Sequence, residues 1–303
     1  MTRVTIVLIA ALLCAGCGVK TAYNNLDRLI IWSANDFVDF DKAQSAYLRD
    51  ELEVLLHWHR TTQLPLYAVG LRKLERDVRN GMDIEALLAV EGMVRSWGEA
   101  LTQASMPLSA ELLYSLSDAQ IIELAVGFEE SNAEFLEPYE GLDVEARREV
   151  WAEEFVDGIK LLAGRLSKDQ VRLVDGYRDR YRPDDAAWLD YRRRWQAAVI
   201  AALRERQSYE RFELAFRDIA GQRERWYGDE YRTLFEHNEA MYRDLTVELI
   251  GSLDAKQVSR FSDRLLSIAE DFEQLAGDAS AVAPMPACLV TCSDGVAVGA
   301  SVE

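Results

Sequence analysis

A five-residue pattern occurs three times in this chain: a leucine, then Ser or Asp, two further residues, and a glutamine. Its physical meaning is the start of a helix. The Ser or Asp oxygen accepts a hydrogen bond from a backbone N–H that the first turn leaves unpaired, and the Gln side chain binds back to the N–H of the cap residue. The polar pairs of these capping boxes are Ser117 with Gln120, Ser167 with Gln170, and Asp254 with Gln257. We therefore expect helices to begin at these three points.

Apolar residues flank each box, one before the cap and one at the fourth helical position. The pairs are Leu116 with Ile121, Leu166 with Val171, and Leu253 with Val258. When such a pair packs together it forms a hydrophobic staple, which fixes the angle at which the chain enters the helix. We expect all three staples to form.

Apolar residues recur at helical spacing through most of residues 41–277, and no alternating strand pattern of useful length occurs. Pro65 is expected to break or kink the first long helix, and Met106-Pro107 to form a loop. A heptad seam indicates one long helix after Pro183: it consists of Trp188, Trp195, Ala202, Tyr209 and Phe216, with Tyr191, Ala198, Phe212 and Ile219 interleaved and an interruption at Glu205. The fold class that follows is all-α, an elongated bundle of long antiparallel helices.

The N-terminus has the pattern of an export signal. Arg3 precedes an apolar run, residues 4–13, that is too short to span a bilayer but has the length of a signal-peptide core. The run ends in Leu-Cys-Ala-Gly-Cys, which resembles a bacterial lipobox, with Cys14 where that motif usually has Leu. The resemblance implies that Cys17 is lipidated and becomes the mature N-terminus; ordinary signal-peptidase cleavage nearby is the alternative. Gly18 is not Asp, which in Gram-negative lipoproteins implies the outer membrane, with the body facing the periplasm.

These signals divide the chain into four expected parts. They are a lipoprotein signal peptide (1–16), a lipidated N-terminus with a docking tether (17–40), a helical domain (41–277) and a disordered tail (278–303). The tether is rich in aromatic and apolar residues, so we expect it to pack on the helical domain, because a free linker would be more polar. Cys288 and Cys292 lie in the tail, and whether they form a disulfide stays open.

Charge and motif content bound the chemistry. A formal net charge of -18 at pH 7 disfavours nucleic acid and anionic membrane faces as partners. His57 and His59 are two residues apart on an expected helix, so they point to different faces and do not form a metal pair. No hydrolase, nucleotide-binding or metalloprotease motif occurs. We expect no catalytic residues, no metal and no cofactor, and hence no enzyme.

Basic residues cluster at 192–225, inside this acidic chain. They include Arg192, Arg193, Arg194, Arg204, Arg206, Arg211, Arg223 and Arg225. Because Glu and Asp residues lie beside most of them, we expect local ion pairs; a docking strip for an anionic envelope partner is the alternative.

Two segments carry a resemblance to a known family. Tyr-Asn-Asn-Leu-Asp at 23–27 and Trp-His-Arg at 58–60, the latter followed by Leu-Pro and Tyr-Ala, resemble a family of uncharacterised bacterial lipoproteins with the signature YNNLD…WHRxxxLPxYA. The likeness runs in order along most of the chain. It implies an envelope location and an all-helical body, but no activity. The signature residues are Tyr23, Asn24, Asn25, Trp58, His59, Arg60 and Pro65.

The three capping boxes carry a narrower resemblance, to the LTxxQ motif of Spy/CpxP-type periplasmic chaperones and stress regulators. Ser or Asp replaces Thr here, and the body is far longer than theirs. We therefore expect an outer-membrane-anchored lipoprotein with a non-catalytic protein-binding role, chaperone-like or related to envelope stress. A structural or assembly accessory of one specific envelope partner is the alternative, and a hydrolase of envelope polymers is the least supported. The membrane contact is expected through the lipid anchor, and the protein partner stays open.

Overall fold

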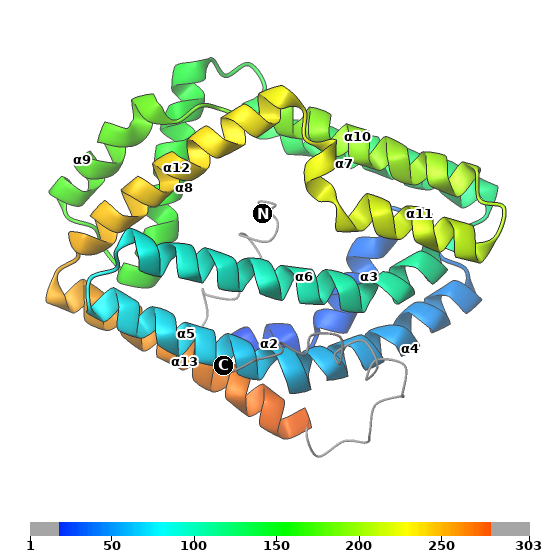
Figure 1. Ribbon diagram of the computed structural model, residues 1–303, viewed down its shortest axis with the longest axis horizontal. Helices are drawn as coiled ribbons and strands as arrows, with labels where there is room; N and C mark the ends of the chain where they lie inside the picture. The colour runs from blue at the N-terminus through cyan, green and yellow to red at the C-terminus, as the bar shows by residue number, and fades with distance from the viewer. Residues whose placement is uncertain (1–17, 280–303) are drawn as a thin grey trace, which may run out of the picture.

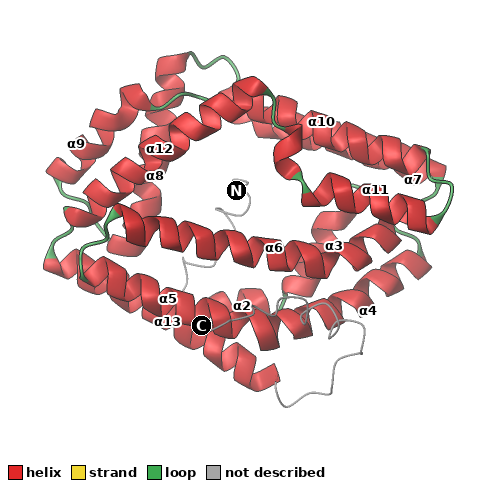
Figure 2. Ribbon diagram, in the orientation of Figure 1, coloured by secondary structure: helices red, strands yellow, loops and turns green. Residues whose placement is uncertain are grey.

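The computed structural model describes residues 18–279, and every regular element in that range is a helix, with no strand (Figure 2). The all-α prediction is confirmed. None of these helices combines the length and apolar character needed to cross a bilayer. The elements are α2 (Gly18–Tyr23), α3 (Leu26–Asn35), α4 (Lys42–Trp58), η1 (His59–Gln63), α5 (Leu64–Arg79), α6 (Ile84–Tyr114), α7 (Asp118–Leu136), η2 (Glu137–Tyr139), α8 (Val144–Ala163), α9 (Lys168–Tyr177), η3 (Arg178–Arg180), α10 (Asp185–Arg204), α11 (Tyr209–Gly221), η4 (Arg223–Trp226), α12 (Asp229–Gly251) and α13 (Ala255–Ala279).

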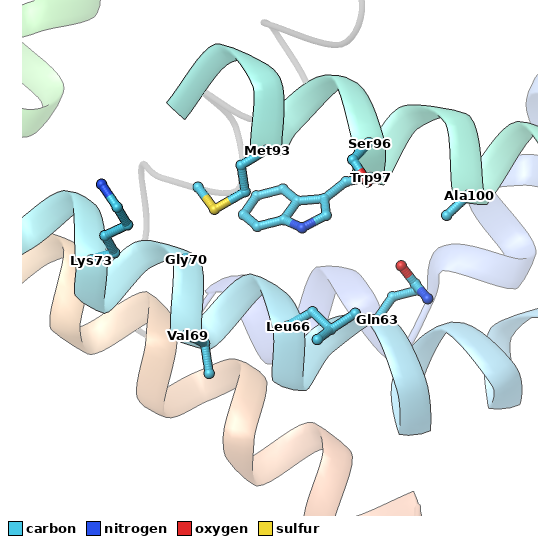
Figure 3. Close-up of a pocket in the computed structure, with 9 residues that line it drawn as sticks. All are labelled: Gln63, Leu66, Val69, Gly70, Lys73, Met93, Ser96, Trp97 and Ala100. Carbon is cyan, nitrogen blue, oxygen red and sulfur yellow. The ribbon is translucent and has the colours of Figure 1, made fainter. Parts of the chain in front are cut away.

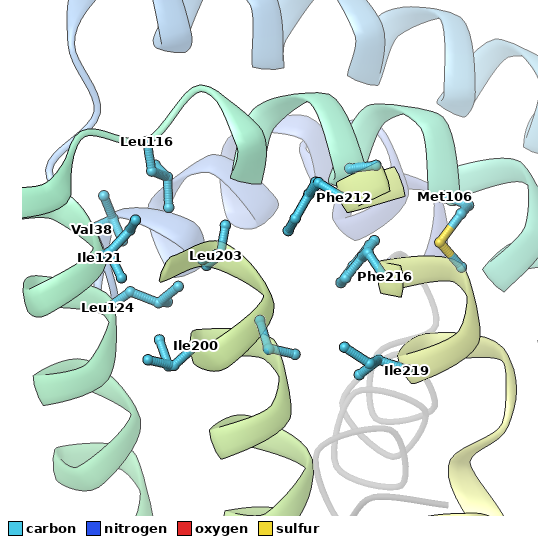
Figure 4. Close-up of a cluster of buried hydrophobic side chains, with 12 residues drawn as sticks. Val38, Met106, Leu116, Ile121, Leu124, Ile200, Leu203, Phe212, Phe216 and Ile219 are labelled. Atoms are coloured by element: carbon cyan, nitrogen blue, oxygen red, sulfur yellow. The ribbon is translucent and has the colours of Figure 1, made fainter. Parts of the chain in front are cut away.

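The helices form an elongated frame in which α5 and α13 lie side by side along one edge (Figure 1). The core is divided among several apolar clusters. The largest joins α6, α7, α10 and α11, with Val38 from the segment before α4 (Figure 4). Another joins α8, α9 and α12, and smaller ones join α5 to α8 and α13, α2 to α5 and α13, and α3 to α4 and α6. Most of the helices therefore bury one stripe against their neighbours, whereas α3 has no buried residue.

The helices repeat one arrangement twice. In the first half α4 and α5 are followed by α6 and α7; in the second half α9 and α10 are followed by α11–α12 and α13. In the first half α4 contacts α6, and in the second half α9 makes the equivalent contact with α12. The last helix of each half packs on the second helix of the other half, α7 on α10 and α13 on α5. The two halves therefore interlock, and neither completes its packing alone.

Aromatic contacts follow the same repeat. The rings of Tyr67 and Trp97 join α5 to α6 with centroids 4.4 Å apart, and those of Tyr191 and Tyr231 join α10 to α12 at 5.4 Å. An ion pair between Arg243 of α12 and Glu91 of α6 ties the two halves together at 2.6 Å.

The predicted heptad seam is folded back on itself. α10 ends at Arg204, and α11 begins at Tyr209 with Ser208 as its cap, so the single long helix expected after Pro183 is wrong. The interruption at Glu205 marks the turn. Most of the seam residues on both sides of the turn enter the same cluster, and Figure 4 shows three of them, Phe212, Phe216 and Ile219. Because the chain turns back, α10 and α11 bury their apolar seam residues in one shared cluster. A single straight helix would need a partner helix of the same length to bury them.

One other local prediction is also wrong. α6 is continuous through Pro107, where a loop was expected, because the buried side chains of Met106, Leu108 and Ala110 hold that segment against the core. The staple residues differ in burial: Leu116 and Ile121 are both buried, whereas in the second pair Leu166 is buried and Val171 is 41% exposed.

The expected tether packs on the body. Tyr23 of α2 is buried in a cluster with Leu64 and Leu275, and Val38 belongs to the largest cluster. Helix α13 ends at Ala279, two residues beyond the predicted end of the helical domain. The predictions for the signal peptide, for Cys17 and for Cys288 and Cys292 lie outside the described residues.

Candidate functional site

All three predicted capping boxes form. The side chains of Ser117, Ser167 and Asp254 each accept the backbone N–H three residues on, and the Gln at that position binds back. A fourth box, which the sequence analysis missed, opens α4: Asp41 is the cap and Gln44 its partner. Phe40 stands where the other boxes have Leu, so the five-residue pattern excluded it. The Asp-x-x-Gln spacing alone would have been sufficient to find it.

The boxes come together in pairs. Gln170 and Gln257, 87 residues apart, exchange two hydrogen bonds, each Nε2 donating to the other Oε1 at 2.8 Å. Each Nε2 also donates to a backbone carbonyl two residues before the other cap, Ser252 and Arg165, at 2.9 Å. We call this arrangement the Gln170–Gln257 clasp.

The other two boxes repeat this geometry. Gln44 donates to the Oε1 of Gln120 at 3.1 Å, and Gln120 donates to that of Gln44 at 2.7 Å. Their second amide hydrogens reach the carbonyls of Ser115 and Asp39, at 3.0 and 2.9 Å. These carbonyls again lie two residues before the opposite cap. The Gln44–Gln120 clasp therefore joins the starts of α4 and α7, as the other joins the starts of α9 and α13.

The clasps leave little for a ligand to bind. In each glutamine Oε1 accepts from its own cap N–H and from the partner amide, and Nε2 donates to the partner and to a carbonyl. Both donors and both usual acceptor positions of each amide are occupied. The boxes are therefore structural junctions, and a binding site has to be sought elsewhere.

The signature residues surround an irregular turn. α4 passes into α5 through the π-helix η1, in which the N–H of Leu64 bonds to the carbonyl of His59. Thr62 Oγ1 donates to the Trp58 carbonyl at 2.7 Å. Pro65 follows directly and, lacking an N–H, cannot continue the α-helical ladder. The helix is widened by one residue where a break or kink was expected, and such π-turns are frequent at functional sites.

The two halves of the signature meet at this turn. The Tyr23 hydroxyl lies 2.8 Å from His59 Nδ1, and the Arg60 guanidinium donates to Asn24 Oδ1 at 2.8 Å. Arg60 also lies over the Tyr23 ring, 5.0 Å from its centroid. Asn25, which precedes α3, instead donates to the Thr21 carbonyl of α2. The signature cluster, defined here as Tyr23, Asn24, His59 and Arg60, therefore fastens α2 to the start of α5.

Burial sets the charge state of the cluster. It lowers the pKa of His59 to about 4 and raises the pKa of Tyr23 to about 12. Near pH 7 the imidazole is neutral, and one hydrogen bond joins its Nδ1 to the Tyr23 hydroxyl. The cluster combines a neutral, partly buried Tyr23–His59 pair with one cation, Arg60, which binds the exposed Asn24.

His59 should make the fold sensitive to acid. Its pKa is below the ordinary 6.5, so between pH 6.5 and 4 the unfolded chain binds a proton that the folded chain does not. The contribution of His59 to the free energy of unfolding is fully present above pH 6.5. It is lost as pH falls from 6.5 through 4, and the total loss is about 3 kcal/mol. A His59→Gln variant should lack this part of the pH dependence in urea unfolding at pH 7, 5.5 and 4.5. Equal slopes for both proteins would contradict the assignment.

A row of rings leads from this cluster to a groove. The His59 ring meets Tyr67 edge-on with centroids 5.3 Å apart, and Tyr67 contacts Trp97 of α6 at 4.4 Å and Phe272 of α13 at 6.2 Å. Trp97 forms one wall of the groove between α5 and α6. The signature cluster therefore positions, through Tyr67, the largest side chain of that groove.

The α5–α6 groove has a volume of about 340 Å³. Met93 and Trp97 point from α6 toward α5 (Figure 3). They pack over Gly70, where a Cβ atom would come within 2.6 Å of both side chains. Leu66 and Val69 on α5 are 54% and 66% exposed. The remaining lining residues are Gln63, Lys73, Ser96 and Ala100.

Other residues singled out from the sequence are placed in structural roles. His237 contacts the Arg180 carbonyl at 2.7 Å. In the basic segment Arg194 pairs locally with Asp190 and Arg225 with Asp218, whereas Arg193 and Arg206 pair with the distant Glu129 and Asp118. Within residues 18–279 no group of three or more His, Cys, Asp or Glu side chains is placed to hold a metal ion.

Comparison with known proteins gives a family but no activity. A family described as "Family of unknown function (DUF6279)" matches residues 36–232, about two thirds of the chain. The match includes η1 and the Trp58–Arg60 part of the signature, and it ends inside α12. No curated protein and no solved structure matches the chain.

Proposed function

This chain belongs to the family of unknown function DUF6279, and we propose that it is a lipid-anchored, non-catalytic protein of the bacterial outer membrane that binds apolar segments of other envelope proteins. The α5–α6 groove carries this proposal. Apolar side chains dominate its walls, and two of them, Leu66 and Val69, are more than half exposed. Adjacent exposed apolar residues that line a groove favour an interaction site over chance surface variation.

The groove suits an apolar peptide segment. Met93 offers a flexible, polarisable side chain that adapts to different shapes, and Trp97 offers a broad ring held in place by Tyr67. Gln63 and Ser96 supply hydrogen-bonding groups of the kind that pair with a peptide backbone. The occupant we propose is an extended or partly unfolded segment of an envelope protein.

The location is proposed from the N-terminus. The lipobox resemblance at residues 13–17 puts the lipid on Cys17, and the absence of Asp at position 18 favours the outer membrane, with the body in the periplasm. The described chain begins with α2 at Gly18 and packs at once on the body. An anchor at Cys17 would therefore hold the groove close to the membrane surface.

The proposal is tested by suppression of aggregation. The chain starting at Gly18 retains all the clusters described here, and it should suppress aggregation of several unrelated unfolding proteins at near-equal stoichiometry. A Leu66→Ser/Val69→Ser variant should bind about tenfold more weakly, since roughly 1–2 kcal/mol of apolar contact is lost. Leu214→Ser is the matched control, because Leu214 is 69% exposed but lies on α11.

The outcomes separate the candidate roles. Suppression that the groove variant loses and the control keeps supports the proposal. No suppression by the unaltered chain rejects a general chaperone-like role, and it favours an accessory of one specific envelope protein. Equal loss in both variants would place the binding surface outside the groove.

A further inference from the structure

Helix α3 is a surface helix that exposes large apolar side chains. It has no buried residue. Ile30, Ile31 and Ala34 pack partly on the cluster shared with α4 and α6, while Trp32 is 67% and Leu29 is 45% exposed. Within residues 18–279, Trp32 is the only exposed tryptophan.

Two arginines lie beside this tryptophan. Arg28 of α3 and Arg49 of α4 line a depression of about 500 Å³ together with Trp32 and Ile31. Within the described residues neither guanidinium forms an ion pair, whereas Arg72 and Arg79 on α5 and Arg193 and Arg194 on α10 do. Asn35 and Asp27 complete the lining, and Asp27 is the one carboxylate among these residues. The depression therefore combines two cations with apolar surface.

The start of the chain is held on α13 and on His59. Lys20 of α2 donates to Gln274 at 2.6 Å and pairs with Asp271 at 3.4 Å, and Tyr23 contacts His59. Cys17 directly precedes α2, and one residue spans about 3.8 Å. α2 and α3 hold six and ten residues, and at 1.5 Å per residue they place Trp32 within roughly 25 Å of an anchor at Cys17.

We propose that Arg28, Arg49, Leu29 and Trp32 form a phospholipid-binding patch that rests on the membrane surface beside the anchor. The guanidiniums bind headgroup phosphates, for which their forked donors are suited. Trp32 and Leu29 lie at the headgroup level, where tryptophan is enriched in membrane proteins. The net charge of -18 does not prevent this, because physiological salt screens charges beyond about 8 Å.

This proposal rests on the proposed lipid anchor for its orientation, but its test does not. The chain starting at Gly18 carries no lipid, and its binding to vesicles of phosphatidylethanolamine with phosphatidylglycerol is measured by flotation. We expect measurable binding that weakens about fivefold for each of Arg28→Gln and Arg49→Gln. Trp32→Ala should weaken it by a similar factor or more. Leu214→Ala, on α11, should not change it.

The outcomes distinguish the patch from the anchor. Absence of vesicle binding by the unlipidated chain, or equal binding by the patch variants, overturns the patch. The anchor is tested separately, by the mass of the full chain purified from bacterial membranes and by its loss in Cys17→Ser. All four replaced side chains of the vesicle test are exposed, so thermal unfolding should show the variants to be folded.

Discussion

Replacing Gln257 with Ala is expected to lower the free energy of unfolding by about 3 kcal/mol, an effect large enough to threaten the fold. Gln257 is 7% exposed, and its amide serves three groups: the N–H of Asp254, the amide of Gln170 and the carbonyl of Arg165. Truncation leaves all three without that partner in a desolvated site. Urea unfolding of the two proteins at pH 7 measures the difference.

The control for this experiment is Gln103→Ala, because Gln103 lies exposed on α6. Its replacement should change stability by less than about 0.5 kcal/mol. The double variant Gln170→Ala/Gln257→Ala should be less destabilised than the sum of the two single variants, by about 1–3 kcal/mol. Additive effects would show that the clasp is two independent helix caps.

A second buried amide pair should recover more of its stability on double replacement than the clasp does. Asn132 of α7 and Gln196 of α10 are 0% and 4% exposed and exchange hydrogen bonds of 2.8 and 3.3 Å. Asn132→Leu alone leaves the Gln196 amide unpaired and should cost about 2–4 kcal/mol. The double variant Asn132→Leu/Gln196→Leu removes both polar groups and should recover most of that loss.

The contrast between the two pairs has a physical reason. The Asn132–Gln196 amides bond to each other, so apolar residues of similar size replace them without leaving polar atoms behind. The clasp glutamines also serve backbone groups, which no side-chain replacement removes. Thermal unfolding of the single and double variants checks this difference. If the double leucine variant does not recover stability, the loss comes from poor packing of the leucines in this site and not from the unpaired amide.

Local features of the fold could be predicted because they depend on nearby residues. The boxes at Ser117, Ser167 and Asp254 form because cap and glutamine are three residues apart. The pairing of the boxes depends on residues more than seventy positions apart, so no local pattern shows it. The turn at Glu205 and the continuity of α6 through Pro107 were decided by the core that the helices share.

The candidate site was predicted only in its components. The family resemblance singled out Tyr23, His59 and Arg60, but not that α2 would fold back onto η1. Leu66 and Val69 gave no signal, because their spacing on α5 fits ordinary amphipathic packing. That they stay exposed is seen only in the folded structure, where α6 packs on α5 at Gly70 and leaves these two side chains uncovered.

The most direct test of the account is photo-cross-linking from the groove. A photo-reactive amino acid replaces Val69 in one protein and Leu214 in another, both being exposed apolar positions on helices. Each protein is irradiated with an unfolding client, and the products are mapped by mass spectrometry. We predict covalent products with apolar client segments from position 69 and none from position 214. Equal labelling from both positions, or labelling from position 214 alone, would contradict a binding role for the α5–α6 groove.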